Sequence, residues 1–190
     1  MTLERTSFIN LAMSLPRHIA HSYLNFVHGQ TGSYRQNCYE ALLRAVQKEL
    51  GNPEQEAAGC RIALETALSV DRRGSIWVRC KTLAAMGSET CSNAAVRLAY
   101  WLLMEGMEPP KAVDIRRLEL ACESLEDLTQ RDALTAYFVT SLLRPNASEL
   151  PPMLRQRLML SHEIAASIVR VHRRTRPNVI DSFLEDEESI

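Results

Sequence analysis

The stretch AAVRLAYWLLM, from Ala94 to Met104, decides the fold of this chain. Its only charged side chain is Arg97. A helix that is apolar on nearly every side is normally buried within a helical domain. Crossing a membrane takes about 20 apolar residues, and this stretch is roughly half as long. We therefore predict a buried helix here, with the rest of the chain packed around it.

Arg97 is the exception within this helix. Burying an unpaired guanidinium is very costly. We expect Arg97 either to reach solvent through the less apolar stripe of the helix or to pair with a carboxylate of a neighbouring helix. At about 100° per residue, that stripe consists of Asn93, Arg97, Tyr100, Trp101 and Met104.

The composition favours helix along nearly the whole chain. Of 190 residues, 46% are hydrophobic and 24% charged, which is the balance of a globular domain with a substantial core. Gly and Pro number only 7 and 8. We predict an all-α fold, a single compact domain over residues 1–176 with seven to nine helices in antiparallel hairpins, or alternatively a solenoid-like array. Residues 177–190 are predicted to be a short segment with a mobile acidic tail.

Capping residues and glycines divide the helical stretches from one another. Ser33 with Gln36 matches a capping box, and so does Ser124 with Asp127, while Gly87 is expected to form a turn between two helices. The predicted helices span residues 3–13, 14–29, 33–50, 52–70, 75–86, 88–105, 109–122, 124–143 and 151–175.

Charge and cysteine usage restrict the compartment and the partners. The net charge of -1 gives no global reason to expect a nucleic acid or a membrane surface as an obligatory partner. The five cysteines are odd in number and lack C-x-x-C spacing, so they indicate neither a disulfide framework nor a zinc site. Four of them share helical faces with apolar residues and are expected in the core, namely Cys38, Cys60, Cys80 and Cys122. No secretory signal is visible, and we predict a cytoplasmic protein, bacterial or in a host cell.

The sequence contains none of the familiar catalytic patterns. We find no G-x-S-x-G, Walker A loop, G-x-G-x-x-G, H-E-x-x-H or EF-hand spacing. His18, His21 and His28 share a helical face, but His28 lies about 10 Å beyond His21 along the axis, too far to share an ion with the other two. We therefore predict a protein that is not an enzyme and that has no metal site and no cofactor.

In the last predicted helix, residues 151–175, the apolar side that includes Met153, Leu160, Ile164 and Val171 is expected to face the core. The opposite, basic side includes His162 and offers the best candidate binding surface. These side chains fit three interpretations: a solvated helix end that complements the dipole, a phosphate contact, or a surface for an acidic protein. The acidic residues 185–188 follow closely, and by hypothesis they shield the arginines until a partner displaces them. The candidate binding residues are Arg155, Arg170, Arg173, Arg174 and Arg176.

The function predicted from these features is protein binding. We expect a non-enzymatic helical interaction module, such as an adaptor, chaperone, regulator or scaffold component, that binds protein partners through helix faces and that could form homo-oligomers. The alternative is a protein that binds nucleic acid through the arginine-rich helix, largely independently of sequence.

Overall fold

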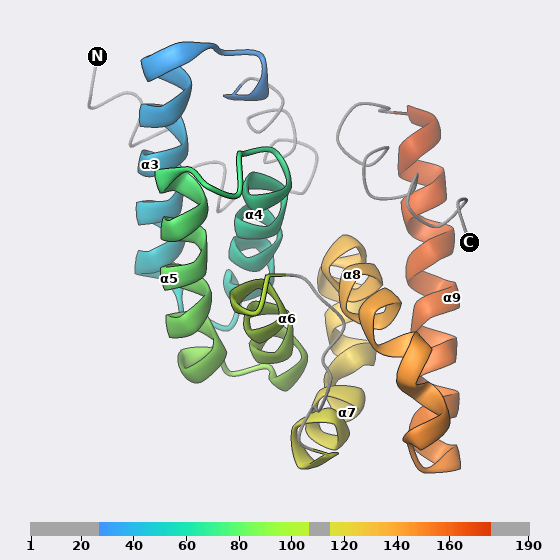
Figure 1. The fold of residues 1–190 in the computed structure, drawn as a ribbon. Helices are drawn as coiled ribbons and strands as arrows, with labels where there is room; N and C mark the ends of the chain where they lie inside the picture. The colour runs from blue at the N-terminus through green and yellow to red at the C-terminus, as the bar shows by residue number, and fades with distance from the viewer. Residues whose placement is uncertain (1–26, 107–114, 176–190) are drawn as a thin grey trace.

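The structure is a computed structural model that describes residues 27–106 and 115–175, and every regular element in these ranges is helical (Figure 1). Because no strand occurs there, the prediction of an all-α domain is confirmed. The helix predicted over 3–13 lies outside the described residues, as does most of the one predicted over 14–29. The elements are α3 (Gly32–Glu49), α4 (Glu56–Leu68), α5 (Ser75–Thr90), α6 (Ala94–Met104), α7 (Ile115–Arg131), α8 (Ala133–Leu143), the 3-10 helix η1 (Arg144–Glu149) and α9 (Pro152–Thr175).

Helix α6 occupies the middle of this arrangement, as its sequence predicts. It packs against α5 and α7 and also contacts α4 and α8 (Figure 1). The predicted less apolar stripe is wrong in one respect, because Tyr100 is fully buried while Arg97, Trp101 and Met104 are half-buried. Helix α4 reaches α7 and α8 as well as its chain neighbours. In a solenoid each repeat contacts only its neighbours, so the helices form one closed domain and not an open array.

Gly87 is not the turn that the sequence suggests. It lies inside α5, which continues to Thr90, and a Cβ atom at this position would overlap the ring of Tyr100. Glycine is therefore needed here for close approach between α5 and α6, which explains both the glycine and the burial of Tyr100. The turn comes four residues later, at 91–93.

This turn is held by polar groups that were not anticipated. The buried Glu56 carboxylate accepts hydrogen bonds from the backbone N–H and hydroxyl of Ser92 and from the backbone N–H of Asn93, each at 2.7 Å. Asn93 in turn caps α6, since its Oδ1 accepts from the N–H groups of Ala95 and Val96. Of the two expectations for Arg97, pairing with a carboxylate is not met among the described residues, and the half-buried side chain instead donates from Nη1 to the carbonyl oxygens of Cys91 at 2.7 Å and Ser92 at 2.8 Å.

The predicted boundary at Ser124 is also wrong. Helix α7 runs through this position, where the Ser124 hydroxyl donates to the carbonyl oxygen of Leu120 in the preceding turn. The helix breaks at Asp132, whose side chain accepts from the N–H of Thr135 and so caps α8. A local sequence signal could not separate the two sites, because either residue can cap a helix.

Two of the predicted helix starts also shift. Helix α3 begins after Thr31 without a side-chain cap, and Gln36, expected to close a capping box with Ser33, donates instead to the hydroxyl of Ser75. Helix α4 begins at Glu56, because Asn52 Oδ1 accepts from the N–H of Glu54 in a turn that precedes the helix.

A buried ion pair joins α4 to the start of α8. Arg61 Nε donates to Asp132 Oδ2 at 2.8 Å, and Arg61 Nη1 lies 4.0 Å from Glu65 Oε1. All three side chains are buried. Burial, together with the negative charge of Asp132, raises the pKa of Glu65 to about 7, although Arg61 opposes this shift.

Replacing Gly87 with alanine should destabilise the fold. Because Tyr100 is fully buried and its ring occupies the space of the added methyl group, we expect a loss of about 1–3 kcal/mol in the free energy of unfolding. Urea denaturation measures this change. Thr82→Ala, at an exposed site of the same helix, is the control and should stay within about 0.5 kcal/mol of the wild type. Equal stabilities of the two variants would contradict the close packing of α5 on α6.

Glu65 should make stability fall as the pH rises. Its pKa is about 7 in the folded chain and near 4.5 when unfolded, so the folded state binds more protons between these values. The free energy of unfolding should therefore decline from pH 5 to pH 8, by about 2–3 kcal/mol in total from this group. Denaturation of Glu65→Gln and wild type across this range isolates the effect, because all other titrating groups are shared. Parallel pH profiles for the two proteins would refute it.

Candidate functional site

Helix α9 buries one face against α7 and α8 (Figure 1). This face combines small side chains with a leucine, a valine and a histidine. These contacts with two neighbouring helices hold α9 in place. The buried residues are Leu158, Ser161, His162, Ala165, Ala166 and Val169.

His162 belongs to this packed face and not to the solvated stripe that the sequence suggests. Its ring stacks on Tyr137 with centroids 5.3 Å apart. The Thr140 hydroxyl donates to the Ala136 carbonyl oxygen, so at 3.0 Å it accepts from His162 Nδ1. His162 Nε2 lies 2.8 Å from Arg144 Nη1, which can only donate. The imidazole is thus a neutral link between α8, η1 and α9, and no spacing in the sequence indicates these partners.

The opposite side of α9 presents an apolar stripe to solvent. Met153 is 70% exposed, Leu160 56%, Ile164 46% and Val171 63%. Their spacing of 7, 4 and 7 residues aligns them within about 20° of one line, which runs about 27 Å along the axis. The sequence assigned these four residues to the core side of the helix, and the structure corrects this assignment. We call Met153, Leu160, Ile164 and Val171 the outer stripe.

The structure does not gather the predicted arginines into one described patch. Arg155 Nε donates to the carbonyl oxygen of Ala147, and its Nη2 donates to those of Ser148 and Leu150, at 3.0–3.2 Å, so this guanidinium stabilises the end of η1. Arg170 is exposed and lies about 22 Å further along the helix. The side chains of Arg173 and Arg174, and Arg176 as a whole, lie outside the described residues, as do residues 177–190.

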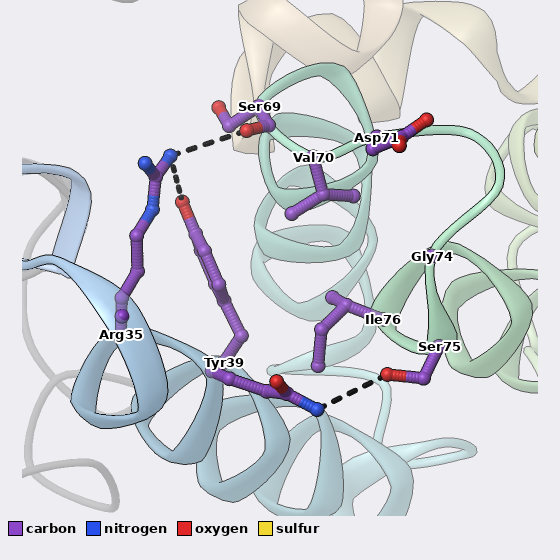
Figure 2. Close-up of a pocket in the computed structure, with 10 residues that line it drawn as sticks. Arg35, Tyr39, Ser69, Val70, Asp71, Gly74, Ser75 and Ile76 are labelled. Carbon is purple, nitrogen blue, oxygen red and sulfur yellow. Dashed lines mark hydrogen bonds between the residues drawn. The ribbon is translucent and has the colours of Figure 1, made fainter.

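A second candidate site is a pocket of about 270 Å³ between the start of α3 and the turn before α5 (Figure 2). Arg35 Nη2 donates to the hydroxyl of Tyr39 at 3.2 Å and to the carbonyl oxygen of Ser69 at 3.1 Å. The Tyr39 hydroxyl also lies 2.6 Å from Nδ1 of His28. The lining residues are Gly32, Arg35, Gln36, Tyr39, Ser69, Val70, Asp71, Gly74, Ser75 and Ile76.

The polar groups of this pocket largely bind one another. Burial and the charge of Arg35 lower the pKa of His28, and burial raises the pKa of Tyr39 despite its hydrogen bond from Arg35. Both side chains are therefore neutral near pH 7, with the Tyr39 proton donated to His28. This chain of hydrogen bonds ties α3 to the end of α4 (Figure 2). Sequence reasoning missed the pocket because its two sides are at least 30 residues apart in the chain.

The five cysteines are unpaired. All five are buried, which confirms the prediction for Cys38, Cys60, Cys80 and Cys122 and adds Cys91. Burial raises the pKa of Cys80 and of Cys91 to about 12, so both stay protonated at neutral pH.

The described ranges also bear on metal binding and on membranes. These residues hold no group of three acidic, histidine or cysteine side chains placed for a metal ion. No helix among them is both long enough and apolar enough to cross a membrane. The buried Glu65 carboxyl, whose pKa is raised, is not among the residues that line the described pocket. The outer stripe therefore remains as the strongest candidate for a binding surface.

Comparisons with known proteins add no further assignment. No family model matches the chain, and no curated protein or solved structure matches it either.

Proposed function

We propose that this protein is a helical protein-interaction module and that the outer stripe of α9 is its docking surface for an apolar helix of a protein partner. The observation that carries the proposal is the alignment of four exposed apolar side chains on a helix whose opposite face already completes the core. Scattered exposed apolar residues are ordinary on protein surfaces, whereas an apolar strip along one helix is typical of an interaction site.

The spacing of the outer stripe favours a helix as the partner element. Steps of three and four residues along α9 connect Met153, Arg157, Leu160, Ile164, Ser167 and Val171, which is the 3.5-residue period of helix pairs with interlocking side chains. A helix that lies on a lipid surface usually carries many Lys and Arg residues on its polar face. Here the exposed neighbours of the outer stripe include the acidic Glu163 as well as Arg157 and Arg170. This mixture of charges favours a protein partner over a lipid surface.

This proposal retains the class of function inferred from the sequence, a protein-interaction module. It places the binding surface at the outer stripe instead of at the arginines. An adaptor, chaperone, regulator or scaffold component would use the outer stripe, and the arginines would play a secondary part. A role in binding nucleic acid is less well supported, since the guanidinium of Arg155 is already bound to three carbonyl oxygens. Five unpaired cysteines favour a reducing compartment such as the cytoplasm.

Site-specific photocrosslinking tests this function. A photoreactive phenylalanine analogue at Leu160 or Ile164, in the full chain within cells, should form an adduct of one discrete mass that maps to an apolar helix face. The same analogue at Val78, which is 60% exposed on α5, is the matched control and should form none. Leu160→Glu should abolish the adduct at Ile164. Equal labelling at Val78 and Leu160, or no intermolecular adduct at α9, would overturn the proposal.

A further inference from the structure

We propose that the partner is a second copy of this chain, and that two α9 helices pack antiparallel about a two-fold axis that passes near residue 162. The inference rests on the proposed function of the outer stripe and names its occupant. It follows from the order of side chains along the stripe.

The seam positions of α9 have the same chemical order from either end. Read from the N-terminus they are apolar, polar, apolar, apolar, polar and apolar, and the reverse reading is identical. An antiparallel two-fold about residue 162 therefore sets apolar against apolar and polar against polar in every layer. The layers pair Met153 with Val171, Arg157 with Ser167 and Leu160 with Ile164 of the second copy.

The charge of Arg157 selects the antiparallel arrangement over the parallel one. In a parallel pair with the same seam, each residue meets its own counterpart, so the two Arg157 guanidinium groups would face each other. In the antiparallel pair Arg157 meets the small hydroxyl side chain of Ser167, and the two Glu163 side chains lie near each other at the opposite, exposed edge of the contact. The antiparallel pair thus removes the repulsion between guanidinium groups from the seam, and the like charges of the two Glu163 side chains stay at its solvated edge, where their interaction is weak.

The edges of the stripe also fit this pairing. Leu154 and Ile168, both half-buried in one copy, lie along the same edge and are symmetric about residue 161. The two-fold brings each close to the other across the axis and so widens the apolar contact. Arg170, on the other edge, is brought toward Gln156 of the second copy, which offers an amide oxygen.

The contact predicts a weak and reversible dimer. Two helices in contact over about 27 Å fall at the low end of specific interfaces, below about 1,200 Å². We expect a dissociation constant of about 10–100 μM, so that the protein is monomeric when dilute and dimeric when concentrated.

Sedimentation of the full chain over a concentration range from about 1 to 500 μM tests the pairing against that expected constant. Leu160→Glu should weaken the dimer by at least about 100-fold, since each copy loses a central apolar side chain and places a charge in the seam. Val78→Glu, which introduces the same charge at an equally exposed apolar site, should leave the dissociation constant unchanged. A monomeric wild type at the highest concentration overturns the inference, as does an equal effect of the two variants.

Charges at Ser167 decide the orientation, and they do so without disturbing the core because this side chain is exposed. In the antiparallel pair Ser167→Glu meets Arg157 of the second copy and should tighten the dimer by about 3- to 10-fold, whereas Ser167→Arg should weaken it by a similar factor. A parallel pair would bring like charges together in both variants and weaken both. The parallel result, or no response to either substitution, contradicts the proposed axis.

The photocrosslinking described above separates failure of this inference from failure of the proposed function. An adduct at Leu160 with twice the mass of the chain supports the second copy. An adduct with a different protein, combined with a monomeric wild type, refutes self-pairing but leaves the docking surface intact. A purely intramolecular adduct with residues 1–26 refutes both.

Discussion

The buried ion pair between Arg61 and Asp132 sets how the first and second halves of the chain meet. A guanidinium enters a protein interior only with a matched carboxylate, so α4 has to lie against the residue at which α8 begins. The same helix also provides Glu56, whose carboxylate holds the turn at 91–93 where α6 begins. Two carboxylates thus fix the starts of α6 and α8, the two most apolar helices. Glu56 of α4 holds the turn before α6, and Asp132 at the start of α8 pairs with Arg61 of α4. The apolar faces of α6 and α8 then complete the core.

Once α6 and α8 are placed, α9 needs only one of its faces for folding. Small residues and the neutral His162 fill the space against α7 and α8, and Arg155 secures the end of η1. The outer stripe lies on the other side of the helix and contributes little to the fold of a single copy. The four apolar side chains that remain exposed in line on this helix are the observation on which the proposed pairing rests.

Features that depend on composition and periodicity could be predicted from the sequence. Features that depend on contacts between residues far apart in the chain could not. The helical content, the burial of α6 and of four cysteines, and the extent of α9 all follow from composition and periodicity. Gly87 and Ser124 were read as boundaries because glycine and serine usually mark them, but Tyr100 and the cap at Asp132 override those local signals. Along α9 the sequence shows apolar residues on two sides, and periodicity cannot tell which side meets the core. That choice depends on α8, which supplies Thr140 and Tyr137 to His162.

A distance between two copies tests the central claim most directly. A spin label on Arg170→Cys, an exposed site beside the seam, reports the separation of equivalent residues in the concentrated protein, and the native cysteines are buried. The antiparallel arrangement predicts a separation of at least about 24 Å along the axis, because residue 170 lies eight residues from the two-fold. A separation near 10 Å, the spacing of two packed helices side by side, would contradict that arrangement. The absence of any dipolar coupling would contradict pairing through α9 altogether.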